Sequence, residues 1–382
     1  MSSGDETDSG ARTDSGARTD SGMRGVPEQP HPALQTKLTE LAGVRYPIVQ
    51  TGMGWVAGAR LVSATAEAGA LGILASATMT LEQLRGAIGE VRSRTEAPFG
   101  VNLRTDSPDI AERVSLLIQS KVRVASFAQA PRPDLVKQLR DAGIVVMPTV
   151  GARRHAEKVA EWGVDLVIAQ GAEGGGHTGE IPTTLLVPQI VEAVADRVGV
   201  VAAGGFHSGA GLVAALAWGA SGIAMGTRFL LTKESTVPDE VKALYLATPV
   251  TGTVVTRAVD GAPQRVVCTD LIGHLEGAGR FAAMPRAARN ALSFSRQTGD
   301  SMLSLLREGL AMKKSSDLSW AQVVMAANAP MMTKAALVDG RTDVGVLPTG
   351  QVVGTIDSLP TVAELVAGIV SEANATLDRL CR

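Results

Sequence analysis

The stretch VGVVAAGGFHSGAGLVAALAWGASGIAMGTRF (residues 198–229) indicates the fold class. It begins and ends with the short apolar runs VGVVAAGG (198–205) and GIAMGTRF (222–229), and a segment with helical spacing lies between them. Strands that are apolar on both faces are typical of parallel sheets, because helices cover each face of such a sheet. The stretch therefore predicts a strand–helix–strand unit with parallel strands.

Six further runs of the same kind precede this unit. They are PIVQ (47–50), LGILA (71–75), FGVNL (99–103), VRVASF (122–127), IVVMPTV (144–150) and DLVIAQG (165–171). Amphipathic segments separate them, such as LEQLRGAIGEVRSR, in which Leu81, Leu84, Ile88 and Val91 fall on one helical face. Eight strand–helix alternations predict a TIM (β/α)8 barrel. A doubly wound open sheet is the alternative, but the sequence shows no second mononucleotide-binding half.

The chain divides into four predicted segments. Residues 1–33 form a tail in which the repeat TDSGAR, TDSGAR, TDSGMR (7–24) lacks aliphatic anchors, so we expect disorder there. A nucleotide-level expansion or a translation start at Met23 explains the repeat better than a binding role. Residues 34–232 form the barrel, and residues 233–340 have the helical spacing of a smaller domain laid across the barrel mouth. Residues 341–382 return the chain to the barrel and end in a helix that packs on it.

Composition argues against several classes of protein. The 382 residues are 45% hydrophobic and 19% charged with a net charge of -2, as in a globular enzyme with a large core. No apolar run reaches about 18 residues and no signal peptide is evident, so we expect a cytoplasmic protein without a membrane segment. The near-neutral charge argues against a nucleic-acid partner. Cys268 and Cys381 are too few and too far apart for a disulfide framework or a metal site.

In a parallel barrel the residues that follow the strands form the active-site face. Here they include the glycine-rich turn GAEGGGHTG (171–179) and the turns after the last two strands. Gly204, Gly205, Gly226 and Thr227 can present main-chain N–H groups to a phosphate, as barrels often do at this place. The same glycines could simply form tight turns, but the two sets together favour a phosphate site.

The strand ends lack several kinds of catalytic group. None of the eight runs contains a lysine for a Schiff base, and no cluster of histidines and carboxylates follows them for a metal. Both cysteines fall after the barrel, which argues against a cysteine nucleophile after a middle strand. What remains is the phosphate cradle, the amides Asn102 and Gln170, glycine-thinned walls and His177. This set suits a flat bound cofactor, and we expect no metal.

Five of these motifs, taken in order, carry a resemblance to a known family. PIVQTGMGW (47–55), FGVNL (99–103), AQGAEGGGHTG (169–179), AAGGF (202–206) and AMGTRF (224–229) resemble the nitronate monooxygenases, formerly called 2-nitropropane dioxygenases. These are FMN-binding TIM barrels related to the FabK-type enoyl reductases. Within the family, MAANAPMM (325–332) and GVLPTGQVVG (345–354) are most similar to a branch that acts on coenzyme A thioesters in bacterial degradation of the steroid C and D rings.

The resemblance implies FMN as the cofactor and assigns roles to the turns. The residues it places at FMN are Gly52, Met53 and Gly54 along the flavin edge, Asn102 and Gln170 at the flavin or ribityl chain, Gly175 close to the ring, Gly205, Ala224, Met225, Gly226 and Thr227 at the phosphate, and Gly350 and Gln351 at the flavin. His177 would stand over the reactive face and donate or accept a proton, because an imidazole changes charge near neutral pH. The alternative is that His177 only caps a turn.

The resemblance also implies a small-molecule substrate, in this branch a coenzyme A thioester. Arg104, Arg153, Arg154 and Arg228 lie near strand ends and could meet the phosphates of coenzyme A, although exposed arginines are usually just solvated. The methionines Met302, Met312, Met325, Met331 and Met332 either cover a bulky acyl group or pack a core.

Three functions stay open at this point. The first is FMN-dependent dehydrogenation or reduction next to the thioester, with NADH as a candidate electron donor. The second is oxidation of alkyl nitronates with O2, and the third is FMN binding without turnover. A homodimer is a candidate assembly.

Overall fold

The computed structural model describes residues 30–277 and 320–382. The predicted disordered tail up to residue 29, Met302, Met312 and the side chain of Met325 lie outside the described residues. The described chain begins with the short helix η1 (Pro32–Leu34), in which Leu34 is fully buried. Regular structure therefore starts slightly before residue 34, the first residue of the predicted barrel segment.

Parallel strands close into a barrel. In order around it they are β1 (Ile48–Gln50), β2 (Leu71–Ala75), β3 (Gly100–Leu103), β4 (Val124–Phe127), β5 (Val145–Val150), β6 (Leu166–Gln170), β8 (Gly199–Ala203) and β9 (Gly222–Met225). The last strand pairs with the first, with Ile223 opposite Ile48. Each strand lies within one of the eight apolar runs, so the predicted TIM barrel is confirmed and the doubly wound alternative is wrong. The final run is shorter as a strand than its sequence predicts, because Thr227 already begins a helical turn.

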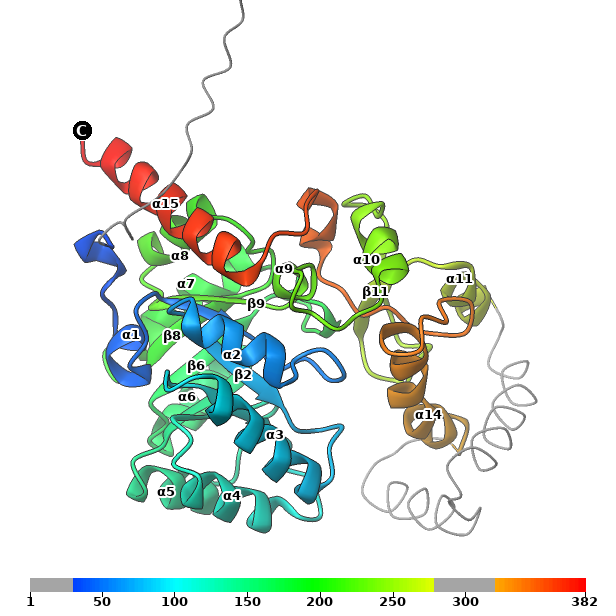
Figure 1. Cartoon of the computed structure of the whole chain (residues 1–382), viewed down its shortest axis with the longest axis horizontal. Coiled ribbons are helices and arrows are strands. Elements are labelled where there is room, and N and C mark those ends of the chain that lie inside the picture. Colours follow the sequence, from blue (N-terminus) through cyan, green and yellow to red (C-terminus); the bar gives the residue numbers. More distant parts are fainter. Residues whose placement is uncertain (1–29, 278–319) are drawn as a thin grey trace, which may run out of the picture.

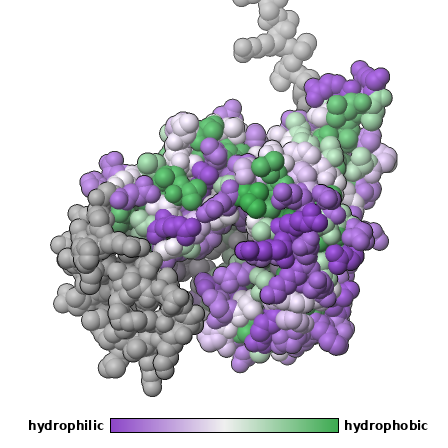
Figure 2. Space-filling view, turned by 180° about the vertical axis from the view of Figure 1, so that it is seen from behind, coloured by the Kyte–Doolittle hydropathy of each residue, from purple (hydrophilic) through white to green (hydrophobic). Residues whose placement is uncertain are grey.

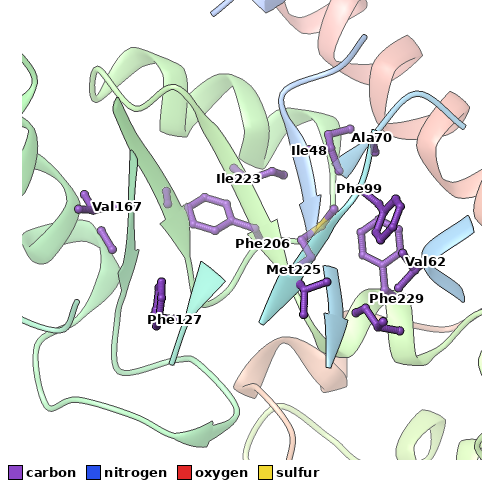
Figure 3. Close-up of a cluster of buried hydrophobic side chains, with 14 of the residues drawn as sticks. Ile48, Val62, Ala70, Phe99, Phe127, Val167, Phe206, Ile223, Met225 and Phe229 are labelled. Carbon is purple, nitrogen blue, oxygen red and sulfur yellow. The ribbon is translucent and has the colours of Figure 1, made fainter. Parts of the chain in front are cut away.

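The strands are apolar on both faces because each face is buried. In β5, Val145 and Met147 belong to the cluster inside the barrel, whereas Val146 between them belongs to the layer between strands and helices. Figure 3 shows that outer layer, with Phe127 and Val167 on their strands. Helix α1 (Lys37–Ala42) also contributes to the interior cluster through its buried apolar side chains. The buried apolar area on both faces is the main favourable contribution to the stability of the barrel.

Helices follow most of the strands. They are α2 (Ala59–Glu67), α3 (Leu81–Arg94), α4 (Ile110–Gln119), α5 (Pro133–Asp141), α6 (Arg153–Glu161), α7 (Thr183–Val194) and α8 (Gly209–Ala217). After β9 comes the single short turn α9 (Thr227–Leu230), and the helix α15 (Val362–Leu380) packs against α8 and α2 (Figure 1). The main chain of α15 approaches Gly209 so closely that a Cβ there would lie 2.3 Å from the Ile369 carbonyl oxygen. The C-terminal helix thus completes the outer layer of the barrel.

A second, smaller part lies beside the barrel (Figure 1). It contains α10 (Asp239–Leu246), β10 (Thr253–Thr256), β11 (Gln264–Val267), α11 (Asp270–Gly277) and α14 (Trp320–Leu337). The two strands form an antiparallel sheet with the two-residue strand β7 (Gly176–His177), so the expectation of helices throughout 233–340 is wrong for this hairpin. Val266, Ile272 and Val346 form a small core here, and Met332 packs against it. Met332 therefore takes part in core packing, which was one of the two roles considered for the methionines.

The rear face of the molecule is mixed in hydropathy. Figure 2 shows hydrophobic side chains there in separate patches with hydrophilic side chains between them. Among the described helices, none combines the length and the apolar character that a membrane crossing requires.

Candidate active site

A cavity of about 420 Å³ opens at the carboxyl ends of the barrel strands. This volume lies within the range of pockets that hold cofactors or drug-sized ligands. The residues of the sequence-predicted site that line it are Gly52, Met53, Gly54, Asn102, Gln170, Gly175, His177, Gly204, Gly205, Ala224, Met225, Gly226 and Thr227. The fold therefore brings together turns from five different strands, as a parallel barrel requires.

The inner wall of the cavity is polar but uncharged around Asn102. The Asn102 side-chain amide donates to Ser126 Oγ at 3.3 Å, and Ser76 Oγ donates to the Asn102 carbonyl oxygen at 2.6 Å. A Cβ at Gly52 would lie 2.5 Å from the Asn102 Cβ, so a side chain at position 52 would displace the amide. Asn102 is therefore held by its neighbours in a fixed position at the cavity wall.

Gln170, at the end of β6, fixes the glycine-rich loop that follows it. Its Nε2 donates to the His177 carbonyl oxygen at 2.8 Å. The loop residue Gly174 packs directly on this side chain, because a Cβ at position 174 would lie 2.8 Å from Gln170 Nε2. The amide thus has a bond within the protein, and its remaining donor and acceptor capacity faces a cavity that it lines.

Gly175 lines the cavity, but its lack of a side chain has a cause inside the protein. A Cβ at this position would lie 2.4 Å from the carbonyl carbon of Thr349 and 2.5 Å from the nitrogen of Gly350. The main chain of the returning segment, rather than a ligand, is therefore what excludes a side chain here. The resemblance places Gly175 close to the flavin ring, but the neighbouring main chain alone already requires glycine at this position.

The turns after β8 and β9 form the predicted phosphate cradle. Gly204 and Gly205 have φ of +99° and +84°, a left-handed backbone that favours glycine. A Cβ at Gly205 would meet no protein atom nearer than Glu173 Cβ at 3.8 Å, so this glycine borders open space. Thr227 Oγ1 accepts a hydrogen bond from the Gly350 N–H at 2.9 Å and is thereby tied to the returning segment. The geometry needs glycine for the turn, and it also leaves room for an anion.

Glu173 is a cavity residue that sequence reasoning did not identify. Its Oε2 accepts hydrogen bonds from the Thr183 main-chain nitrogen at 2.9 Å and from Thr183 Oγ1 at 2.6 Å, at the first residue of α7. Its carbonyl oxygen accepts from the Gln351 N–H at 2.9 Å. Glu173 therefore joins the glycine-rich loop, α7 and the returning segment. Gln351, which was expected at the flavin, makes this main-chain bond and does not line the cavity, whereas Gly350 does.

His177 stands at the rim of the cavity, with 66% of its side chain exposed. Its Nε2 lies 2.8 Å from Asp260 Oδ2, and the Asp260 side chain is only 12% exposed. Burial of the Asp260 carboxylate tends to raise its pKa, but hydrogen bonds from His177, Ala262 and Gln264 outweigh burial and hold the pKa below its ordinary value. The site therefore pairs the predicted histidine with an ionised carboxylate that the sequence did not point to.

Residues of the second part close one side of the cavity. Pro330, Thr333 and Leu337 of α14 line it together with Trp55 from the turn after β1. Trp55 Nε1 donates to the Pro330 carbonyl oxygen at 3.1 Å, so the indole connects the barrel to α14. None of these α14 residues carries a charge, which gives the cavity an apolar side suited to a hydrophobic group.

The four arginines expected at coenzyme A do not line the cavity. Arg104 pairs with Asp106 at 2.6 Å on the surface, and Arg153 pairs with Glu157 at 2.9 Å within α6, where Arg154 is its neighbour. Arg228 does not fit the expectation at all. Its side chain is buried, and Nη2 donates to the Leu231 and Ser358 carbonyl oxygens at 2.7 and 2.8 Å.

The donor set suits a flat organic cofactor with a phosphate better than a metal ion. The cavity is lined by uncharged amides, by glycine turns that border open space, by one histidine, and by Glu173, whose carboxylate is bonded to Thr183. Within residues 30–277 and 320–382, no group of three or more His, Cys, Asp or Glu side chains is arranged to hold a metal. The cradle at Gly205, which a Cβ would partly fill, is the observation that fits a bound phosphate.

Comparisons with known proteins agree with this geometry. The model of the family described as "Nitronate monooxygenase" matches residues 35–115 and 109–372. The chain is 57% identical over 347 residues to a Rhodococcus jostii protein named (3aS,4S,5R,7aS)-5-hydroxy-7a-methyl-1-oxo-octahydro-1H-indene-4-carboxyl-CoA dehydrogenase, covering 91% of this chain and 98% of the relative. A Mycobacterium tuberculosis protein of the same name is 56% identical over 341 residues, covering 89% of this chain and 96% of the relative.

Two solved structures are also similar to this chain. FabK from Thermotoga maritima is 31% identical with a TM-score of 0.73, covering 91% of this chain and 98% of its own. A nitroalkane oxidase from Streptomyces ansochromogenes is 27% identical with a TM-score of 0.71, covering 90% of this chain and all of its own, 100%.

Proposed function

Because the chain belongs to the nitronate monooxygenase family, a family of oxidoreductases, we propose that it is an FMN-dependent oxidoreductase that dehydrogenates an acyl-CoA derived from steroid rings. The identity to two relatives named as dehydrogenases of a hydroxylated octahydro-indene-carboxyl-CoA extends over about nine-tenths of the chain. The observation that carries the proposal is the cavity at the strand ends, in which a histidine paired with a carboxylate faces glycine-lined walls.

FMN is the cofactor that we propose for this cavity. The main chain around Gly205 and Gly226 would hold its phosphate, and Asn102 and Gln170 would hydrogen-bond its ring or ribityl chain. When bound, oxidised FMN supplies the two-electron acceptor that a dehydrogenation requires. Met53 also lines the cavity and gives one wall an apolar surface.

His177 is the proposed general base. A thioester carbonyl makes the neighbouring C–H acidic, so a base can remove that proton as the substrate loses a hydride from the next carbon and a carbon–carbon double bond forms. His177 lies at the cavity rim with most of its imidazole exposed, where an acyl chain that enters from solvent would pass it. The buried Asp260 carboxylate beside it stabilises the imidazolium that results from proton transfer.

Coenzyme A would bind outside the cavity, over its rim. A nucleotide handle contributes binding energy remote from the reacting carbon and so orients the acyl group. Arg104 and Arg154 remain the proposed contacts for its phosphates, because both side chains are on the surface near strand ends. Replacement of either residue by alanine should raise KM for the acyl-CoA with little change in kcat.

Oxidation of alkyl nitronates is the second candidate function. Its support is the family match and the likeness to a nitroalkane oxidase of known structure. The two activities differ in what the cavity must admit, because a nitronate needs no nucleotide-binding surface and no apolar side for rings. FMN binding without turnover is the third candidate.

Rapid-mixing absorbance of the bound flavin tests the proposal. The steroid-ring acyl-CoA named for the relatives should bleach the flavin of the purified enzyme, and His177→Ala should slow this step by about a hundredfold or more, the range for loss of general base catalysis. His31→Ala, far from the cavity, is the control, and FMN content is measured for each variant. Rapid turnover of a propyl nitronate with no bleaching by the acyl-CoA would favour the monooxygenase instead. The absorbance assay is repeated with NADH to detect reduction of the bound flavin by a nicotinamide donor, as the reverse reaction requires.

A further inference from the structure

The contact between His177 and Asp260 joins residues that are 83 positions apart in the chain. Asp260 lies in the connection between β10 and β11, and β11 pairs with β7 so that Gln264 stands opposite His177. This pairing brings the connection to the rim of the cavity. The contact is therefore built by the small antiparallel sheet rather than by the barrel.

Both oxygens of the Asp260 carboxylate have partners. Oδ1 accepts a hydrogen bond from the Ala262 N–H at 3.0 Å. Oδ2 lies 2.8 Å from His177 Nε2 and also accepts from the side-chain amide of Gln264. The carboxylate thus cannot rotate without losing a bond, so its Oδ2 is directed at one atom of the imidazole.

The neighbours of His177 Nε2 determine where the imidazole proton resides. The carboxylate is ionised above its lowered pKa and can only accept. The Gln264 amide donates one N–H to the same carboxylate oxygen, and its second N–H could reach a lone pair on Nε2 only over a longer, uncharged contact of 3.3 Å. A lone pair on Nε2 would face an anionic oxygen at 2.8 Å, which is repulsive. A proton on Nε2 converts this contact into a charge-assisted hydrogen bond.

We propose that Asp260 is a positioning residue that holds neutral His177 with its proton on Nε2, which makes Nδ1 the atom that accepts the substrate proton. Gln264 has a supporting role, because its amide keeps Oδ2 in line with the imidazole. The inference rests on the function proposed above in one respect, namely that His177 acts as the base. The tautomer itself can be measured without any turnover.

In the Asp260→Asn variant we expect a specific change in the tautomer of His177. The Ala262 N–H needs an acceptor, so the asparagine oxygen should occupy the place of Oδ1 and its NH2 group the place of Oδ2. The NH2 group then donates to Nε2, and the imidazole proton moves to Nδ1. The substitution should therefore invert the tautomer and remove the lone pair from Nδ1, the atom proposed to accept the substrate proton.

Nitrogen-15 NMR of the histidine-labelled, flavin-loaded enzyme tests this. The chain has five histidines, and the signals missing in His177→Gln identify those of His177. On the alkaline plateau of a pH series, where the His177 ring is neutral, the wild type should show a protonated Nε2 and Asp260→Asn a protonated Nδ1. Asp141→Asn, which makes the same chemical change in an exposed pair with Lys137, should leave the His177 signals unchanged.

The same variants are compared in single-turnover flavin reduction by the acyl-CoA. Asp260→Asn should slow it by about a hundredfold, and Asp260→Glu should recover part of the rate because it restores an acceptor for Nε2–H. A protonated Nδ1 in the wild type overturns the proposal, even if Asp260→Asn does not fold. An inverted tautomer with an unchanged rate also overturns it. Failure of the acyl-CoA to reduce the wild-type flavin contradicts the proposed function alone and leaves the tautomer result standing.

Discussion

Replacement of Gly175 by alanine should push the glycine-rich loop away from the returning segment. The new Cβ would lie 2.4 Å from the Thr349 carbonyl carbon, whereas ordinary contacts begin at 3.4 Å, so the two main chains must separate by about 1 Å. A main chain cannot give way as a flexible side-chain end can. The hydrogen bond from the Gln351 N–H to the Glu173 carbonyl oxygen, 2.9 Å long, joins the same two segments and should break.

The expected loss in the free energy of unfolding follows from these two effects. Overpacking of a tight contact destabilises by about 1–3 kcal/mol, and the loss of one hydrogen bond adds about 1 kcal/mol. We therefore expect Gly175→Ala to lower the free energy of unfolding by about 2–4 kcal/mol, measured by chemical denaturation. The matched control is Gly179→Ala in the same turn, where the nearest atom would be the Gly151 carbonyl oxygen at 3.6 Å. That control should be neutral, or stabilising by up to about 1 kcal/mol through its unfolded state.

Equal stability of the two variants would refute the close approach at Gly175. A Gly175→Ala protein that is as stable as its control but binds no FMN would show that the cofactor, and not the Thr349 main chain, fills the space beside this glycine. FMN content measured on both variants separates these two outcomes.

Three other substitutions test contacts that hold the site in place. Arg113→Ala removes a buried guanidinium that is bonded to Asp109 and to two main-chain carbonyls. It should lower the free energy of unfolding, measured by urea denaturation, by about 2–4 kcal/mol. The control Arg94→Ala, in an exposed ion pair, should lower it by less than about 1 kcal/mol. The hydrogen bond from Arg113 is the main cause that lowers the pKa of Asp109. The ionised Asp109 therefore stabilises the fold above the ordinary pKa of 3.8, and this stabilisation is lost as pH falls through the lower pKa of the folded state. In thermal melts recorded across this pH range, Asp109→Asn should reduce the loss of stability at acid pH. Thr227→Val leaves the buried Gly350 N–H without its acceptor, so the melting temperature should fall by the equivalent of about 1–3 kcal/mol.

The barrel could be predicted because its signal is local. A strand buried on both faces is apolar at most of its positions, and this pattern marks the runs that became β5 and β6 without reference to any partner. The hairpin of β10 and β11 has no such mark. β10 is only partly buried, polar residues occupy positions in both strands, and the third strand is the two-residue β7, whose pairing with β11 is set by residues far away in the chain. Hydrophobic periodicity cannot reveal a partner of that kind.

The cavity walls were predictable for the same reason, and the acid–base pair was not. Strand ends in a barrel converge on one face, so Gly205 and Asn102 could be placed there from the runs that precede them. Asp260 has no strand before it in the barrel and reaches His177 only through the small sheet. Gly175 shows a further limit. A glycine beside a ligand and a glycine beside a main chain have the same sequence signal, and only the position of Thr349 distinguishes them.

The barrel and the second part contribute different groups to the cavity. The barrel supplies glycine turns and amides that suit a bound cofactor, and those turns are fixed by the requirements of strand closure. His177 leaves the barrel loop to become part of β7, so its orientation depends on β11 and on the carboxylate of Asp260. Changes in the hairpin can therefore alter the proposed base His177 and its partner Asp260 while the walls of the proposed cofactor site stay intact. Within such an architecture, chemistry can diverge through the second part at little cost to the stability of the barrel.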